Sequence, residues 1–144
     1  MSEMERNLAL TRDVYASWSA SSGTDGATLL DLMTDDVRWG SLANGAPGAE
    51  FAVDTVGKDG VRQYLTSLAA EWTLDYYEVD ELIADRDRVI ALARCGWTNR
   101  ATGKSVRTPK CDVFRFRDGK IAEFRAYYDT ASVRSAATHD DDTG

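Results

Sequence analysis

Hydrophobic residues recur at helical spacing in three stretches, and each stretch predicts a helix. The first helix covers residues 3–21, and the turn-forming stretch "SSGTDG" ends it. Thr24 or Asp25 can cap a short second helix, and the third helix follows a long loop. The apolar positions are Met4, Leu8, Tyr15 and Trp18 in the first helix, Leu29, Leu30, Leu32 and Met33 in the second, and Val61, Tyr64, Leu65, Leu68 and Trp72 in the third.

The remaining pattern is that of strands. The stretch "DDVRW" predicts a short strand, and four longer strands are predicted near residues 74–84, 87–98, 104–117 and 120–130. The stretches "RATGK" and "RDGK" join the last three strands as hairpin turns. Residues 41–57 form a loop that is long for a compact domain, which makes this loop a candidate lid or pocket rim.

Helices followed by a run of antiparallel strands predict a single α+β domain. We expect this domain to span residues 1–133, and we expect the acidic tail at residues 134–144 to be disordered. A strongly curved antiparallel sheet would have the shape of a cone. Three N-terminal helices over one face of that cone would enclose a pocket.

The last predicted hairpin, "CDVFRFRDGKIAEFRAYYD", places an acidic residue on an apolar face. Side chains alternate along a strand, so Asp112 lies in line with Phe114 and Phe116. A two-residue turn at "DG" would set Arg125 opposite Asp112, whereas a bulged turn at "RDG" would set Phe124 there. Burial of one apolar face favours the bulged turn. Asp112 would then have no charged partner opposite it.

The same alternation assigns the faces of the preceding hairpin. It places Ala91, Ala93, Cys95 and Trp97 on the inner face of the sheet. Cys95 then points away from Cys111, and we expect no disulfide between them.

Composition and charge restrict the partners. The net charge is −7 and the isoelectric point about 4.7, which argue against a nucleic-acid or anionic-membrane surface. No apolar run approaches membrane length and "MSEMERN" does not resemble a signal peptide, so we expect a cytoplasmic protein. His139 is the only histidine and no phosphate-binding loop is present, so we expect neither a metal ion nor another cofactor. A neutral, apolar or cationic ligand fits the negative net charge of the chain.

Three stretches of the chain resemble the nuclear-transport-factor-2-like superfamily, in its SnoaL-like and ketosteroid-isomerase-like branch. They are "YASW", "LMTDDVRW" and the last hairpin, and the resemblance covers about residues 8–130. It implies the α+β cone and a pocket for an apolar ligand. It does not select one reaction, because this scaffold carries several unrelated functions.

The resemblance also implies roles for individual residues. In ketosteroid isomerases a protonated Asp and a Tyr donate hydrogen bonds to the substrate oxyanion, and Asp112 and Tyr15 stand at those positions. The proton-shuttling Asp of those enzymes is replaced by Ser41, which argues against steroid isomerisation. SnoaL-like polyketide cyclases use an acidic residue on the strand of Asp112, and that comparison requires fewer residues.

Two classes of function therefore remain. The first is a cofactor-independent isomerase, cyclase or dehydratase that acts on an apolar carbonyl compound, and the second is a non-catalytic binding or dimerisation module. Glu50 or Asp54, in the long loop, could replace the missing base. Epoxide hydrolysis is not expected, because the required Asp-Arg-Asp set matches Cys95, Ala93 and Ala126.

The predicted pocket is mostly aromatic, which suits a small apolar or aromatic ligand. The predicted ligand-binding residues are Trp18, Trp39, Ser41, Tyr64, Trp72, Cys95, Trp97, Phe124 and Tyr128. The outer face of the sheet is also too apolar to remain in water, and the resemblance implies that two such sheets pair in a homodimer. The outer-face residues are Leu92, Val113, Arg115, Arg125 and Tyr127.

Overall fold

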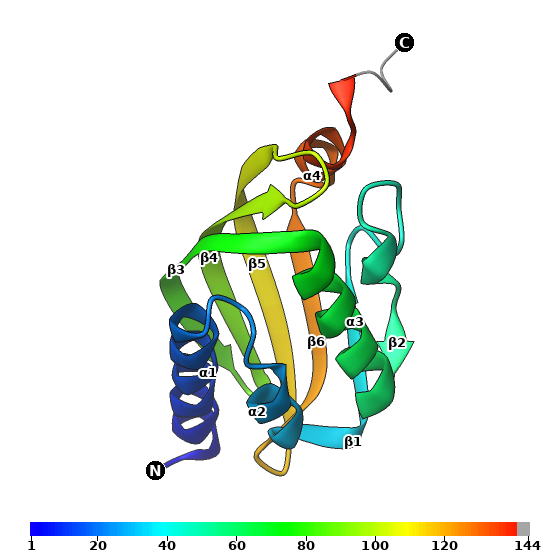
Figure 1. Ribbon diagram of the computed structural model, residues 1–144. Coiled ribbons are helices and arrows are strands. Elements are labelled where there is room, and N and C mark those ends of the chain that lie inside the picture. Colours follow the sequence, from blue (N-terminus) through cyan, green and yellow to red (C-terminus); the bar gives the residue numbers. More distant parts are fainter. Residues whose placement is uncertain (141–144) are drawn as a thin grey trace.

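A curved six-stranded sheet forms the back of the molecule, and α1, α2 and α3 lie in front of it (Figure 1). The computed structural model describes residues 1–140. The strands lie in the order β2-β1-β6-β5-β4-β3. Their bounds are Met33–Ser41 for β1, Thr55–Val56 for β2, Trp72–Asp85 for β3, Arg88–Asn99 for β4, Ser105–Arg117 for β5 and Lys120–Tyr128 for β6. The predicted α+β class is confirmed.

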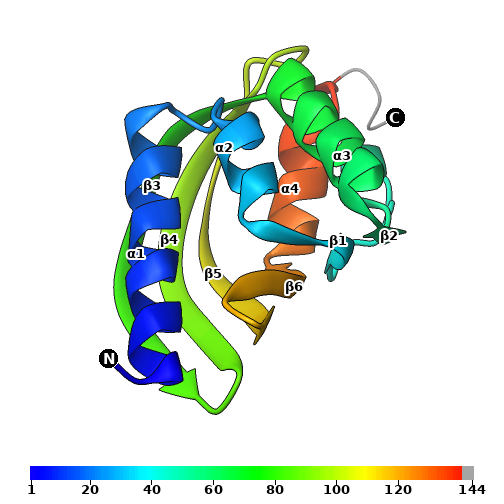
Figure 2. The same cartoon turned by 90° about the horizontal axis from the view of Figure 1, so that it is seen from below.

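Three helices precede the long strands, as predicted. They are α1 (Glu3–Ala20), α2 (Gly26–Asp31) and α3 (Lys58–Glu71), and a single 3-10 turn, η1 (Glu50–Ala52), lies in the long loop. The Ser2 hydroxyl accepts a hydrogen bond from the Glu5 N–H at 3.1 Å and so caps α1. Figure 2 shows α1 beside β3 and β4, whereas α3 lies on the side of β1 and β2. The two helices therefore lie over the same face of the sheet, near its opposite edges.

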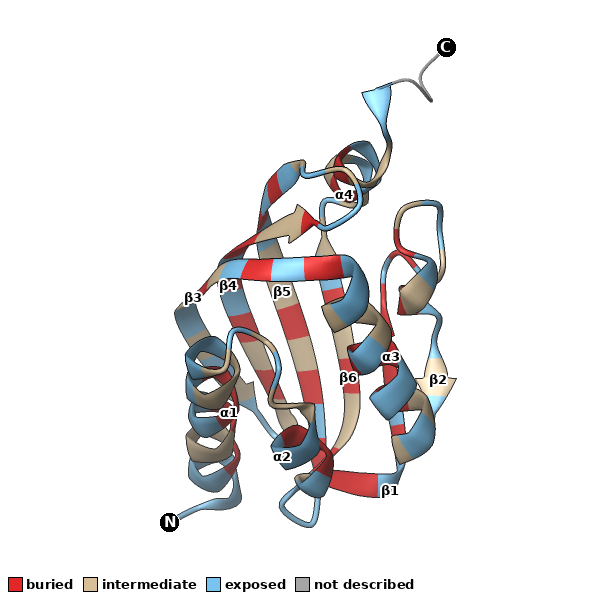
Figure 3. Cartoon of the chain, viewed as in Figure 1, coloured by how far each residue is buried: buried red, intermediate tan, exposed pale blue. Residues whose placement is uncertain are grey.

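The buried face of α1 differs from the predicted one. Asn7, Thr11, Val14 and Tyr15 are the buried residues, whereas Met4 is 42% exposed. The helix therefore turns a partly polar stripe towards the sheet. Of the apolar positions predicted for this helix, only Tyr15 is buried. Burial along the strands alternates as expected, and the buried residues form bands across the sheet (Figure 3).

The β5–β6 hairpin confirms the predicted faces but not the predicted turn. Arg117 pairs with Lys120 across a two-residue turn, and the bulge comes one pair later, between Arg115 and Phe116. Ala126, rather than Phe124, therefore lies opposite Asp112. The extra residue still brings the apolar faces of the two strands together, which is the effect expected of a bulge.

Other element boundaries also need correction. Met33 and Trp72, predicted as helical, begin β1 and β3, respectively. The sheet is not wholly antiparallel, because β1 pairs with β6 in parallel. The long loop contributes β2, which pairs with β1 at Trp39 and Thr55. Cys95 and Cys111 are both free thiols, as expected.

The chain continues beyond the last strand as a fourth helix, α4 (Thr130–Ala137). Asp129 caps this helix by accepting a 3.1 Å hydrogen bond from the Ser132 N–H, and Val133 is buried. The prediction that the chain is disordered from Arg134 onward is therefore wrong for residues 134–137, which belong to α4. The last residues of the predicted tail, 141–144, lie outside the described residues. None of the helices within residues 1–140 is long and apolar enough to cross a membrane.

Candidate active site

A cavity of about 100 Å³ lies between the inner face of the sheet and the helices. It has side chains from α1, α2, α3 and α4 and from β1 and β3–β6 in its walls, together with Phe51 of the long loop. The predicted ligand-binding residues that line it are Trp18, Trp39, Tyr64, Trp72, Cys95, Trp97, Phe124 and Tyr128. The lining is thus mainly aromatic.

Asp112 reaches this cavity from the middle of β5. It shares its face with Lys110, Phe114 and Phe116, since every second residue of a strand points the same way. Its neighbours across the two adjacent strands are Ala91 and Ala126. Small residues on both sides leave room for the polar groups that surround the carboxyl group.

Two tyrosine hydroxyls donate to one oxygen of this carboxyl group. Tyr15 Oη of α1 lies 2.6 Å from Asp112 Oδ2, and Tyr77 Oη of β3 donates to the same oxygen. The two rings are stacked, with their centroids 5.4 Å apart. The two predicted catalytic residues are therefore in direct contact, but the Tyr15 hydroxyl points to Asp112 rather than to a free position in the cavity.

Lys110 is the counter-ion of Asp112. Its Nζ lies 3.3 Å from Asp112 Oδ1, so the carboxyl group has a charged partner on its own strand, although none lies opposite it on the neighbouring strands. Asp112 Oδ1 has no hydrogen-bond partner within residues 1–140. One oxygen is thus held by two hydroxyls, and the other faces the ammonium group of Lys110.

Burial and the neighbouring charges shift the pKa values of the three residues around Asp112, which are Tyr15, Tyr77 and Lys110. Burial raises the pKa of Tyr15 and of Tyr77 well above the usual value, and the charge of Asp112 raises both further. Burial has the largest single effect on the pKa of Lys110 and lowers it, but the charge of Asp112, a hydrogen bond to it and smaller effects of Cys95 and Tyr128 together raise the pKa. At neutral pH Lys110 therefore keeps its ammonium group and both tyrosines keep their hydroxyl protons.

The family model of the SnoaL-like domain matches residues 12–124. The chain belongs to the SnoaL-like domain family. A comparison with curated proteins gives no match.

Solved structures share the fold over nearly the whole chain. An NTF2-like protein of Burkholderia thailandensis E264 is 28% identical, with a TM-score of 0.78, over 92% of this chain and 97% of that one. A protein of Catenulispora acidiphila with a ketosteroid isomerase-like fold, in complex with trimethylamine, is 17% identical, with a TM-score of 0.72, over 91% and 96%. A proposed isomerase of Bacillus subtilis is 21% identical, with a TM-score of 0.77, over 96% and 99%.

Three other candidate residues of this SnoaL-like domain lie outside the cavity lining. Ser41 is fully buried, and its hydroxyl lies 3.2 Å from the hydroxyl of Tyr128. Glu50 is exposed and accepts a hydrogen bond from the Gly48 N–H. Asp54 is exposed and lies 3.4 Å from Arg125. None of the three is in position to act as a base on a ligand in the cavity.

Sequence reasoning missed Lys110 and Tyr77. Lys110 has the same alternation as Asp112 and Phe114, so a signal for its inner position was present. Tyr77 had no such signal, because β3 is irregular between Leu74 and Tyr76.

Within residues 1–140 no cluster of three or more His, Cys, Asp or Glu side chains is arranged to hold a metal ion.

Proposed function

We propose that this SnoaL-like protein is a cofactor-independent acid/base enzyme of the isomerase, cyclase or dehydratase type, and that it acts on a small apolar carbonyl compound. The observation that carries this proposal is the Asp112 carboxylate, which is buried in an aromatic cavity with Tyr15 and Tyr77 on one of its oxygens. A fixed carboxylate next to an apolar binding space is suited to removing a proton from a carbon atom next to a carbonyl group.

Asp112 is the base in this proposal. The two tyrosine hydroxyls hold Oδ2 and so fix the plane of the carboxylate, whereas Oδ1 faces the Lys110 ammonium group at 3.3 Å. Oδ1 is the oxygen that the tyrosines leave unoccupied, so it is the one proposed to accept the proton. Tyr15 acts through Asp112 and is a positioning residue.

The size of the cavity favours a small substrate. Pockets for drug-sized ligands measure about 300–1,000 Å³, whereas this cavity measures about 100 Å³. An engineered cavity of about 150 Å³ holds benzene. A compound the size of cyclopentanone thus matches this cavity better than a steroid does. Trimethylamine in the Catenulispora acidiphila protein is a precedent for a ligand this small in the same fold.

Hydrogen exchange on small ketones tests the proposed reaction. In D₂O the native protein is expected to speed the incorporation of deuterium next to the carbonyl group of cyclopentanone, because the same proton abstraction starts isomerisation and aldol closure. NMR spectroscopy of the ketone measures the rate. Asp59→Asn, which removes an exposed carboxylate on α3, is the matched control and should exchange as fast as the native protein.

The alternative is a binding module without catalytic activity. The replacement of the family's usual base by Ser41, which lies outside the cavity lining, favours this reading. A protein that binds cyclopentanone but exchanges its hydrogens no faster than protein-free buffer would belong to this class.

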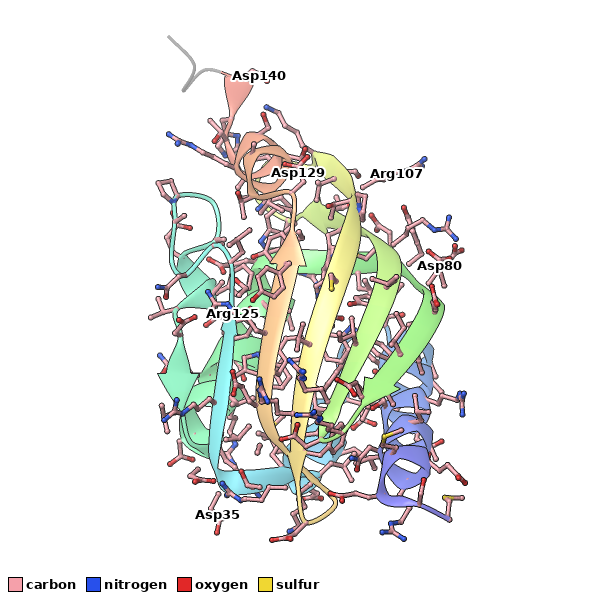
Figure 4. All side chains as sticks on the ribbon, turned by 180° about the vertical axis from the view of Figure 1, so that it is seen from behind. Asp35, Asp80, Arg107, Arg125, Asp129 and Asp140 are labelled. Atoms are coloured by element: carbon pink, nitrogen blue, oxygen red, sulfur yellow. The ribbon has the colours of Figure 1, made fainter. Side chains whose placement is uncertain are left out.

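We also propose a homodimer, formed through the outer face of the sheet. No helix formed by residues 1–140 crosses this face (Figure 4), and Leu92, Cys111 and Tyr127 are consecutive neighbours across β4, β5 and β6. Leu92 and Tyr127 are each 39% exposed, so the row is an apolar strip on the surface. A second copy can cover such a strip with its own by two-fold symmetry.

Sedimentation tests the dimer. The native protein should have twice the chain mass of 15.9 kDa, and the double variant Leu92→Asp/Tyr127→Asp should be monomeric because like charges would meet in the interface. Asp80→Asn, at an exposed position of β3, is the control (Figure 4). A native mass near 15.9 kDa at every concentration would contradict the dimer.

A further inference from the structure

Of the two charged groups in the cluster, Lys110 exposes more of its side chain at the cavity. Its side chain is 16% exposed, whereas that of Asp112 is 1% exposed. An ammonium group has three N–H donors, and the ion pair with Asp112 is its one polar contact among the described residues. Lys110 therefore has donors to spare at the wall of the cavity.

The other neighbours of this ammonium group are aromatic rings. Lys110 Nζ lies 5.0 Å from the ring centroid of Tyr77 and 5.8 Å from that of Phe124. Both distances fall within the range of cation–π attraction, which stabilises the charge but supplies no hydrogen-bond acceptor. The rings fix the position of Nζ and leave the acceptor to be supplied by a ligand.

We propose that Lys110 is a catalytic residue whose ammonium group holds the carbonyl oxygen of the substrate, so that the cavity selects small ketones and aldehydes and rejects amines. This inference rests on the proposed acid/base function and deepens it by naming the group that the substrate must carry. A cationic amine would be repelled by the ammonium group of Lys110, and the Asp112 carboxylate that could attract it is already paired with that group.

The position of Nζ also suits the reaction. It lies 3.3 Å from Asp112 Oδ1, so one small molecule can place its carbonyl oxygen at Nζ and its neighbouring C–H bond at Oδ1. Asp112 takes that hydrogen as a proton, the C–H electron pair forms the new C=C bond, and the π pair of the carbonyl group moves to the oxygen held by Lys110. Return of the proton from Asp112 to a different atom completes an isomerisation, with no other reactant. Preorganised charge at the developing oxyanion is a strong source of rate enhancement.

Lys110 acts here as a charged donor and not as a nucleophile. A lysine amine attacks a carbonyl carbon only in its neutral form. The pKa of Lys110 is raised in spite of its burial, with Asp112 as the main contributor to the rise, so Lys110 stays protonated. No covalent adduct with the substrate is expected.

Three probes of similar size test the inference on the native protein: cyclopentanone, methylenecyclopentane and cyclopentylamine. Binding to the native state raises the melting temperature. Cyclopentanone should raise it most, the hydrocarbon less and the amine not at all. In Lys110→Met the ketone should bind about tenfold to a hundredfold more weakly, as expected for the loss of a hydrogen bond from a charged donor, while the hydrocarbon should bind as before. Lys58→Met, at a lysine far from the cavity lining, is the control.

The infrared spectrum of the bound ketone gives a second measurement that needs no variant. A carbonyl group that accepts a hydrogen bond from an ammonium group should absorb at lower frequency than the same ketone in water. The inference is overturned if the amine binds best, if no probe binds, if Lys110→Met keeps its preference for the ketone, or if the carbonyl band does not shift. Hydrogen exchange that is lost in Asp112→Asn but normal in Lys110→Met would overturn the role of Lys110 and leave the acid/base function standing.

Discussion

Replacement of Asp112 by leucine is expected to lower the free energy of unfolding by about 3–5 kcal/mol, the usual cost of removing one partner of a buried ion pair. Leucine has the same branching as aspartate, although its methyl groups would crowd the tyrosine hydroxyls that contact Asp112 Oδ2. The main loss is electrostatic. It comes from Lys110, which would keep its charge without a counter-ion, and from the hydroxyls of Tyr15 and Tyr77, which would lose their acceptor. Urea denaturation measures the change.

Two further variants separate this cause from others. The double variant Lys110→Met/Asp112→Leu removes both charges and should recover much of the stability, because a buried ion pair can often be replaced by apolar residues at little cost. Asp80→Leu removes an exposed carboxylate that pairs with Arg94, and should cost under about 1 kcal/mol. A leucine variant at position 112 within 1 kcal/mol of the native protein would show that the polar cluster does not contribute to stability.

Strong alkali is expected to unfold the protein. Burial raises the pKa of Tyr15, Tyr64 and Tyr77 above the usual value of 10.0, chiefly because a buried phenolate would lose its hydration. Above pH 10 the unfolded chain releases these protons while the folded chain keeps them. The contribution of these tyrosines to the free energy of unfolding is therefore fully present below pH 10. It is lost as the pH rises towards the folded pKa values, by about 1.4 kcal/mol per pH unit for each tyrosine. Lys110 acts in the same direction, because its pKa is also raised.

Ultraviolet absorbance of tyrosinate, recorded together with circular dichroism, measures this transition. A small domain has a total stability of only about 5–15 kcal/mol. The loss from three tyrosines reaches that amount before their folded pKa values are reached, so the three buried tyrosines should ionise only as the helices and strands unfold. Tyr15→Phe should reduce the pH dependence by the share of one group. Ionisation of all six tyrosines in a protein that keeps its circular dichroism would contradict the buried positions of these hydroxyls.

Much of the fold follows from periodicity alone. Helical spacing predicts α1, α2 and α3, and alternation predicts the inner faces of β4 and β5, because the inner side chains lie in a single buried layer. The fourth helix was missed, although Asp129 is a good capping residue, because the acidic end of the chain indicated disorder. Trp72 continues the helical spacing of α3, so local pattern could not show that it begins β3.

The candidate site was predicted only in part. Asp112 was predicted because its apolar neighbours on the strand are visible in the sequence, whereas Tyr15 was predicted from the family resemblance. The ion pair between Lys110 and Asp112 was not predicted, because a lysine on a strand is usually expected to face water. Tyr77 was out of reach because the irregularity of β3 changes which residues face inward: Trp72, Leu74 and Tyr77 are buried. Alternation cannot locate such a change without the structure.

The rate of hydrogen exchange in Asp112→Asn tests the central claim most directly. Asparagine keeps the shape of Asp112 and an acceptor for the tyrosine hydroxyls, but cannot take up a proton as a carboxylate does. With cyclopentanone in D₂O, we expect exchange about 10²–10⁴ times slower than in the native protein, the usual contribution of a general base, while circular dichroism shows a folded chain. An asparagine variant that exchanges the hydrogens of bound cyclopentanone as fast as the native protein would show that Asp112 is not the base.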